Sequence, residues 1–457
     1  MSELSLSKIF DEASDLAPLL EKIGKATNLS TLVLATLNLA RAMAVIILEF
    51  ELNRRGRESV KWPNCPSCGT KIKSKGFRRR SMLTLAGLVG WKRRVGRCPN
   101  KGCRNRQFVP YDEVLAIAPY QQTSNELKHV ACALSVFVPF EVSAKLLEMI
   151  TQAWVSPTSI WHWVREAGHR AMEQLDHQLQ KLAEGEEPSE ESMDSGVAAL
   201  PLIMGADGVM APFRPHAGSP AGKVDWREVK VGIFARVGKR INKAGKVVTR
   251  LTHRRVVAVL GCSEMLAVRM GFGAICQGMR TAKQVVWISD GGPWLWTIFK
   301  EHFARHATGV LDFYHAAQNI WKAAATCLDG ATEEAKAWFG QARHMLRHEG
   351  SEKVLRDIRK AMHIKDLPES SRDALSKLYD YLNKHREHMD YTRLKELGLP
   401  IGSGMVESAC KWLIQQRFKG VGMRWSEDGF NHLLHLRLAW VNSSFDNLFL
   451  SSCSPNL

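Results

Sequence analysis

The sequence lacks an uninterrupted apolar run long enough to cross a membrane. Its most apolar stretch, residues 30–50, is broken by Asn38 and Arg41 and contains Glu49, whereas a span needs about 20 consecutive apolar residues. We therefore predict a buried helix there and no membrane partner. A secretory leader, with a charged start, an apolar centre and a cleavage site, is also missing, which favours an intracellular, cytoplasmic protein.

Acidic residues are nearly missing from one part of the chain. Between Arg54 and Arg106 stand 17 lysines or arginines and a single acid, Glu58, so this stretch holds nearly all of the net charge of +17. A concentrated basic block is typical of polyanion binding, because each neutralised phosphate releases a condensed counterion. The alternative is a basic face that is only solvated. An acidic lipid surface is disfavoured, since no amphipathic surface helix coincides with the block.

The rest of the composition is that of a soluble globular protein. The chain has 457 residues, of which 45% are hydrophobic and 24% charged, which is enough for two to four domains with separate cores. Residues 1–55 have the apolar spacing of helices, and we expect an N-terminal helical segment that serves packing or oligomerisation. Residues 446–457 form a tail without an assigned structure.

Four cysteines have the spacing of a zinc ribbon. Cys65 and Cys68 form one pair, and Cys98 and Cys103 form a second after 29 intervening residues. Short β-like stretches at residues 82–89 and 91–95 separate the pairs, so we predict a basic zinc ribbon over residues 56–112. Four thiolates satisfy the tetrahedral preference of Zn²⁺ and leave no open position, which makes the site structural. A disulfide pair is the alternative, disfavoured in a reducing cytosol. The other six cysteines have no metal-binding spacing: Cys132, Cys262, Cys276, Cys327, Cys410 and Cys453.

Residues 113–180 are predicted to contain a helix-turn-helix. Residues 143–153 have the apolar spacing of one helix, and Ser156-Pro157 then supplies the N-cap and first-turn proline of another. A helix introduced in this way can enter a DNA major groove, although two-helix units are also common in protein cores. Residues 181–199 follow as an acidic, proline-containing segment, from which we predict a solvated, mobile linker.

After this linker the order of elements predicts a ribonuclease-H-like α/β core. Three extended segments at residues 200–210, 226–237 and 248–260 precede a helix at 263–271, a strand at 284–289, a helix at 294–306 and a strand at 309–313. In that fold the first and fourth strands are neighbours. The core then spans residues 200–322 and 397–445, and an all-helical insertion at residues 323–396 interrupts it.

Three carboxylates have the context of a two-metal site. Asp207 and Asp290 stand at or near the ends of apolar runs, each next to glycine, and Glu407 opens an amphipathic helix after Gly402-Ser403-Gly404. Adjacent first and fourth strands bring the two aspartates together. Oxygen-only ligation suits Mg²⁺, and two such ions stabilise the attacking and leaving oxygens of an in-line phosphoryl displacement. We predict a pair of Mg²⁺ ions, with Mn²⁺ as a substitute, held by Asp207, Asp290 and Glu407.

Each of these acids has competitors. An aspartate beside glycine is often only a turn residue. Asp225 and Glu228 lie in a charged run that fits a solvated strand edge, and Glu427 and Asp428 lie in a polar turn. All four are weaker candidates than the acids in strand-end and helix-start positions.

Several further residues are candidates for contacts with DNA. Asp312 and His315, three apart after the last strand, either face the same site or serve as a structural pair. Lys411 lies one turn after Glu407 and is in reach of a phosphate. The segment that follows is basic, glycine-rich and aromatic, and suits phosphate binding and base stacking, unless its tryptophan only packs; its candidates are Arg417, Lys419, Arg424 and Trp425.

Several long motifs together resemble the bacterial ISKra4-type insertion-sequence transposases. They are DGVM, WREVKVG, SDGGPWLW, LDFYHAAQNIW and GLPIGSGMVESACKWLIQQRFKGVGMRWS, downstream of the cysteine pairs. The resemblance covers residues 60–445 and implies a DDE transposase whose triad is Asp207, Asp290 and Glu407, with Asp207 bridging both ions. The DFYH segment resembles the C/DxxH motif of Mutator-like and hAT-like relatives.

The resemblance implies an enzyme that binds the terminal inverted repeats of its own element, cuts there and joins the freed 3′-hydroxyl to target DNA. Its partner is double-stranded DNA near the bacterial nucleoid, and pairing of two ends implies a homodimer or larger assembly on DNA. Two alternatives remain open. One is a domesticated zinc-ribbon and helix-turn-helix regulator that binds DNA without cutting, and the other is a ribonuclease-H-like nuclease or resolvase without strand transfer.

Overall fold

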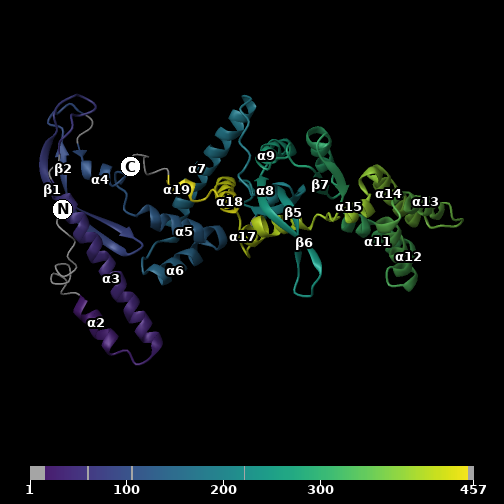
Figure 1. Ribbon diagram of the computed structural model, residues 1–457, viewed down its shortest axis with the longest axis horizontal. Helices are drawn as coiled ribbons and strands as arrows, with labels where there is room; N and C mark the ends of the chain where they lie inside the picture. The colour runs from purple at the N-terminus through teal and green to yellow at the C-terminus, as the bar shows by residue number, and fades with distance from the viewer. Residues whose placement is uncertain (1–15, 59–60, 104–106, 221, 451–457) are drawn as a thin grey trace. The chain divides into compact units, whose positions relative to one another are not determined.

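The computed structural model describes residues 16–58, 61–103, 107–220 and 222–450, and Figure 1 shows the course of the chain. The chain divides into two compact units, one made of Met1–Ala167 with Asp446–Leu457 and the other of Gly168–Phe445. The predicted thiol Cys453 and residues 1–15 of the N-terminal helical segment lie outside the described residues.

The first unit contains a long basic β-hairpin. Strand β1 (Lys73–Thr84) pairs antiparallel with β2 (Gly87–Arg97), which also pairs with the short β3 (Gln107–Phe108). The prediction of a strand at residues 82–89 is wrong, because the hairpin turn falls inside it. There the Thr84 hydroxyl donates to the carbonyl of Gly87, and Gly87 has a φ of 134° that favours glycine. The charged residues of β1 hid its first half from an apolar pattern.

Two helices precede the hairpin, α2 (Ala17–Gly24) and α3 (Leu29–Gly56), and the prediction that residues 30–50 are buried is wrong. Only the C-terminal part of α3 packs on β2, where Glu49 and Asn53 accept hydrogen bonds from the backbone of Gly90 and Lys92. Side chains earlier in α3 are open, with Leu29 76% and Leu34 59% exposed. Among the described helices, α3 alone is long and apolar enough to cross a membrane by length and composition.

The predicted helix-turn-helix region is helical. It comprises α4 (Pro110–Val114), α5 (Asn125–Phe137), α6 (Phe140–Thr151) and the start of α7 (Pro157–Ala183), and α19 (Asn447–Leu450) belongs to the same unit. The expected N-cap is present, since the Ser156 hydroxyl accepts a hydrogen bond from the backbone N–H of Ser159 at 3.1 Å.

The acidic segment before the second unit's sheet is docked, so the prediction of a mobile linker is wrong. The backbone N–H of Glu191 donates to the carbonyl of Cys276, and its carboxylate accepts from Arg255 and from Gln277. Glu187 pairs with Arg280 at 2.7 Å. The acids that made this segment look solvated are ion-pair partners of a basic surface, and it leads into α8 (Ser195–Ala198).

The second unit is built on a mixed five-stranded sheet with the order β6-β5-β4-β7-β8. Strands β4 (Leu202–Phe213), β5 (Asp225–Ile241) and β6 (Val247–Val259) form an antiparallel meander, and β7 (Val285–Ser289) and β8 (Thr308–Leu311) add in parallel beside β4. The first and fourth strands of the domain are therefore neighbours, as predicted. All five residues of β7 are buried, which is typical of a parallel strand covered on both faces.

Helices cover this sheet and extend from it. Helix α9 (Ser263–Cys276) precedes β7, and α10 (Pro293–Ile298) continues into the π-helical turn η2 (Phe299–Phe303) before β8. Trp287 of β7 stacks on Phe303 with ring centroids 5.5 Å apart. The sheet core is thus sealed by aromatic side chains.

The predicted helical insertion is present, and its described residues contain no strand. It consists of α11 (Phe313–Leu328), α12 (Glu333–His348), α13 (Ser351–Met362), α14 (Glu369–Lys384), η3 (Arg386–His388) and α15 (Tyr391–Glu396), drawn in green in Figure 1. Its buried leucines and Ile358 join the same apolar cluster as Trp287. The insertion and the sheet therefore share one core.

The chain then returns to the sheet. Helix α16 (Gly404–Cys410) runs into the π-helical segment η4 (Lys411–Gln415) and α17 (Gln416–Phe418), and α18 (Glu427–Val441) follows. The buried Arg437 guanidinium of α18 donates to the carbonyls of Trp412 and Leu413. A π-helical turn shifts carbonyls out of the usual ladder, and Arg437 satisfies two of them.

Candidate functional site

Three aspartates stand level with one another across the parallel part of the sheet. Met204 of β4 lies opposite Trp287 of β7, and Ser289 of β7 lies opposite Leu311 of β8. Continuing these registers places Asp207 level with Asp290, and Asp290 level with Asp312. Neighbouring strands lie about 4.8 Å apart, so the sheet alone brings the three positions together at the end of β7.

Asp207 is not at the end of its own strand, which corrects one expectation. It pairs with Val231 in the middle of β4, and β4 continues to Phe213. The strand that ends beside Asp207 is β7. The glycines around it are needed for close approach: a Cβ at Gly205 would lie 2.2 Å from the carbonyl oxygen of Ile288. The backbone N–H of Gly208 donates to Asp207 Oδ1 at 2.7 Å.

Asp290 is held in the turn between β7 and α10. Its Oδ1 accepts a hydrogen bond from the backbone N–H of Gly292 at 2.8 Å, and its carbonyl accepts from Trp296 Nε1 at 2.7 Å. Gly291 has no room for a side chain, since a Cβ there would meet the Tyr381 ring at 2.2 Å. Pro293 begins α10, one residue before the predicted start of this helix.

Glu407 enters from a distant part of the chain on the first turns of α16. This helix packs against β4, and a Cβ at Gly205 would lie 2.9 Å from the Val406 side chain. Glu407 itself is exposed. Residues far apart in sequence are thus gathered around the end of β7.

The charges of these acids act on one another. Burial raises the pKa of Asp207 to about 6, the Gly208 hydrogen bond opposes this, and the negative charges of Asp290 and Glu407 raise it further. Like charges perturb each other this way only when they share a small space. Carboxylates under mutual repulsion could hold a cation; among the described residues here, the ligand atoms that lie within 4.8 Å of one another are those of Asp312, His315 and Glu407.

Asp312 is the exception among the acids. Its ligand oxygen lies within 4.8 Å of ligand atoms of His315 and Glu407, yet its carboxylate is already used. Oδ1 accepts from the backbone N–H groups of Tyr314 and His315 at 2.6 and 2.9 Å, and Oδ2 accepts from the backbone N–H and the hydroxyl of Ser403. A carboxylate has about four lone-pair sites, so these four hydrogen bonds compete with a metal ion for Asp312.

Asp312 is therefore a clamp between two halves of the domain. It caps α11 and holds Ser403, the N-cap of α16, which carries Glu407. Its carboxyl is only 1% exposed. Burial alone would raise the pKa of Asp312, but hydrogen bonds from His315 and Ser403 outweigh it and lower the pKa to about 2.

Asp312→Asn is expected to lower the free energy of unfolding by about 2 kcal/mol at pH 7, because a pKa lowered by nearly two units measures that much preference for the charged form. The folded pKa is below the ordinary one, so this stability is lost as the pH falls from about 4 toward 2, and the difference should vanish there. Urea unfolding measures it. Asp390→Asn is the matched control: Asp390 caps the exposed start of α15, and asparagine caps equally well. Equal effects of the two changes would mean that Asp312 is only a cap.

His315 faces the acids beside this clamp. Its Nδ1 lies 3.6 Å from Asp312 Oδ1. The Asp312 carboxylate raises the pKa of His315 against the effect of burial, and the charges of Asp290 and Glu407 add to the rise. An imidazole that tends toward its protonated form next to a carboxylate site is able to hold a phosphate oxygen or to donate a proton.

Two charged residues of β5 lie across from Gly208, one of them the rival acid Glu228. A Cβ at Gly208 would lie 2.1 Å from Glu228 Oε1, and because side chains alternate along a strand, Glu228 lies on the face of the sheet opposite Asp207. Its partner is Lys230 at 2.5 Å, which pairs across the strands with Gly208. The alternating pattern of side chains along β5 could place Lys230 opposite Gly208 only if the register between β4 and β5 were already known.

The basic segment after α16 is largely structural. Arg417 is 2% exposed and lies 5.5 Å from the Trp425 ring, so the expectation that it contacts phosphate is corrected: its guanidinium is in the core. Trp425 donates from Nε1 to the carbonyl of Phe418 and bridges to Phe213 at the end of β4. Packing, the alternative for this tryptophan, is what the structure shows.

The other predicted DNA contacts are on the surface. Lys411 and Lys419 are exposed, and Lys419 lies 5.4 Å from the Trp226 ring. The exposed Arg424 donates to the carbonyl of Gly222. Of the rival acids, Glu427 is occupied at the surface by Arg227, 2.8 Å away.

The four cysteines of the first unit form a second site. Sγ atoms of Cys65 and Cys103 lie 3.5 Å apart, as do those of Cys68 and Cys98, and all four lie within 4.8 Å of one another. Zn–S bonds of about 2.3 Å at tetrahedral angles put sulfurs roughly 3.8 Å apart. The cluster thus fits one structural Zn²⁺, and its sulfurs are too far apart for disulfides.

The hairpin next to this cluster presents unmatched positive charge. Arg79 lies opposite Lys92 across the strands, and both are exposed. Like charges in direct opposition are unfavourable, which suits an anionic partner. Arg80 and Arg93 are different, because both pair with the buried Asp112 and brace the hairpin against α4.

Comparisons with known proteins give little. Neither a protein-family profile nor a curated protein matches the sequence. Among solved structures the chain is similar to the Drosophila P element transposase strand transfer complex, with 10% sequence identity, a TM-score of 0.25, and coverage of 73% of this chain and 80% of that one. A likeness this weak supports no inference about this chain.

Proposed function

We propose that the protein is a DDE transposase with a ribonuclease-H-like core, which cuts DNA at the ends of its own insertion sequence and joins them to target DNA. One observation carries the proposal. Asp207, Asp290 and Glu407 come from three separate elements, yet the register between β4 and β7 sets Asp207 level with Asp290, and helix α16, which carries Glu407, packs against β4. Carboxylates collected in this way from strands and a helix suit two-metal phosphoryl chemistry.

Asp207, Asp290 and Glu407 would hold the metal ions. Bound Mg²⁺ would activate the attacking oxygen and stabilise the leaving one. Asp312 fixes the helix of Glu407, and His315 contacts the phosphate or protonates the leaving oxygen. The basic hairpin, the zinc ribbon and the helices of the first unit bind the inverted repeats, and pairing of two ends makes the DNA-bound form a homodimer or larger.

The test is an assay of cutting and joining with purified protein. Labelled duplexes carrying the gene's own flanking sequences would be incubated with a supercoiled target plasmid, with and without Mg²⁺. Metal-dependent cuts at the ends together with label joined to the plasmid are expected. Cuts without joined product would favour a nuclease or resolvase, and binding without cutting would favour a DNA-binding regulator.

A further inference from the structure

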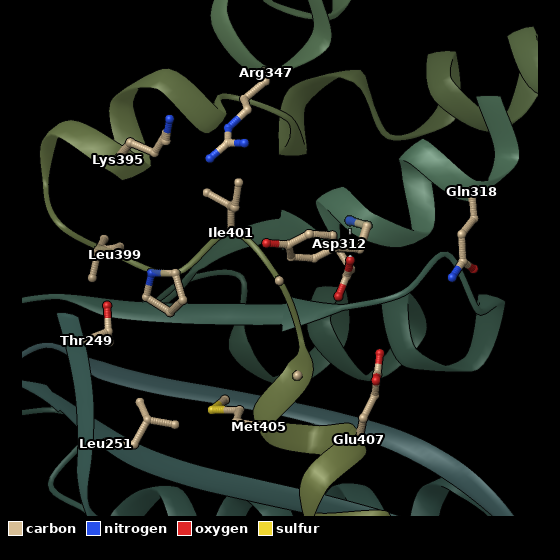
Figure 2. A pocket seen from close by; sticks show the side chains of 14 residues that line it. Thr249, Leu251, Asp312, Gln318, Arg347, Lys395, Leu399, Ile401, Met405 and Glu407 are labelled. Carbon is tan, nitrogen blue, oxygen red and sulfur yellow. Dashed lines mark hydrogen bonds between the residues drawn. The ribbon is translucent and has the colours of Figure 1, made fainter. Parts of the chain in front are cut away.

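A groove leads away from the candidate site between the sheet and the helical insertion. It has a volume of about 730 Å³ and is lined at the site by Asp312 and Glu407. Figure 2 shows Arg347 and Lys395 at the edge of the groove opposite Glu407, with Leu399 and Ile401 along its wall. None of the residues predicted from sequence for DNA contact lines this groove except Asp312.

The far edge of the groove carries positive charge that has no acidic partner. Arg347 of α12 and Lys395 of α15 form no ion pair with any carboxylate in the described ranges. Burial and the charges of Lys395, His344 and Arg347 lower the pKa of His348 nearby. Cations gathered without counter-charges next to an apolar wall form a place for an anion.

An aromatic ring also lines the groove. Tyr314 follows Asp312 by two residues, lines the groove and is 55% exposed. Its ring is fixed from behind: a Cβ at Gly402 would lie 2.6 Å from it, and the Phe313 ring packs edge-on with centroids 5.5 Å apart. The glycine at position 402 thus lets the ring lie against the backbone, with its other side open.

We propose that this groove binds a single DNA strand next to the phosphate that is cut, with one base stacked on Tyr314 and backbone phosphates at Arg347 and Lys395. The volume is that of a pocket for one small ligand, so it takes one or two nucleotides and not a duplex. An exposed ring stacks on any unpaired base, and flanking cations follow the backbone. The inference rests on the proposed function, because it names the form of DNA that reaches the same acids.

The experiment measures binding of a short oligothymidylate carrying one 2-aminopurine, whose fluorescence falls when the base stacks on an aromatic ring. It is done without Mg²⁺, so it does not depend on cutting. Tyr314→Ala is expected to weaken binding about fivefold or more and to abolish the fluorescence change, whereas Tyr314→Phe retains both. A thermal melt of each variant verifies that it is folded.

The cations are tested by the pair Arg347→Ala with Lys395→Ala. Loss of two phosphate contacts is expected to reduce the slope of log affinity against log salt by roughly 1.4 for a single strand. Arg343→Ala is the matched control, since Arg343 lies one turn earlier on α12, sits over the same Phe313 ring as Arg347 and does not line the groove. The control should leave the fluorescence change intact.

Unchanged fluorescence and affinity in folded Tyr314→Ala, or an equal salt slope in the double variant and Arg343→Ala, would overturn the groove proposal. Either result can occur while the wild-type protein still cuts and joins DNA ends, in which case only the groove is wrong. If the wild type does not cut but the groove variants behave as expected, the proposed function fails and the strand-binding site stands.

Discussion

Asp290→Asn is expected to lower the rate of Mg²⁺-dependent cleavage of element ends by about a thousandfold. A metal ion in a phosphoryl-transfer site contributes several kcal/mol of charge stabilisation to the transition state, and about 4 kcal/mol corresponds to that factor. The amide keeps the size of the side chain and its hydrogen bond from Gly292. What it removes is the negative charge that would hold the ion.

Single-turnover cleavage of a labelled end measures the effect, and Glu407→Gln is expected to match it. The control is Glu427→Gln, a rival acid that is exposed and paired with Arg227; it should retain the wild-type rate within about a factor of two. DNA binding without Mg²⁺ should not weaken in Asp290→Asn, since a negative charge near phosphate is gone. Wild-type cleavage by Asp290→Asn would remove this residue from the site.

The melting temperature adds a second readout. Because Asp290 is one cause of the raised pKa of Asp207, Asp290→Asn should relieve repulsion and stabilise the metal-free protein at neutral pH. Mg²⁺ should raise the melting temperature of the wild type more than that of the variant. A variant that is both inactive and less stable would indicate misfolding. In that case the cleavage rate of Glu407→Gln would test the metal-site assignment.

The sheet was predictable because its strands contain apolar runs separated by turns or by single helical segments. The neighbouring positions of β4 and β7, and with them Asp207 and Asp290, followed from element order alone. The ends of the strands could not be predicted in this way. Strand β4 continues past Asp207 because it pairs with β5 as far as Phe213, and this pairing is known only from the structure. Glu407 was placed correctly on a helix, but the Asp312–Ser403 clamp that positions it joins residues 91 apart.

Other errors have the same long-range origin. Residues 30–50 and the acidic segment were judged by composition, yet exposure of α3 and docking of Glu191 depend on what each meets in the fold. Arg417 was taken for a surface cation because nothing in its sequence context shows that Trp425 and the core enclose it. Tyr314, Arg347 and Lys395 come from three helices, and no local pattern brings them together.

Removal of zinc is expected to unfold one end of the hairpin and leave the other end folded. The cysteine cluster packs with Ile72, Trp62 and Phe108, which have few other apolar neighbours. The opposite end of the hairpin has its own cluster against α3, centred on Trp91. A structural Zn²⁺ contributes on the order of 10 kcal/mol of apparent binding free energy near pH 7, so a group this small should not remain ordered without it.

Cys98→Ser tests this. Burial raises the pKa of the Cys98 thiol to about 12, so without a metal its thiol is protonated, and zinc binding should release protons. We expect about one zinc ion per chain in the wild type and none in the variant. Hydrogen exchange should accelerate around residues 62–72 and 98–103, with little change near Trp91. Cys262→Ser, an exposed cysteine outside the cluster, should retain both zinc and protection.

The zinc result also separates the two units in function. Loss of order around the cluster disturbs the arrangement of the exposed hairpin cations, so affinity for duplex ends should fall by about tenfold or more. The acids proposed to bind metal belong to the other unit, so cleavage of a duplex at saturating protein should continue. If Cys98→Ser abolished cleavage even at saturation, with its sheet intact by hydrogen exchange, the ribbon would have a part in assembling the active site beyond binding the ends.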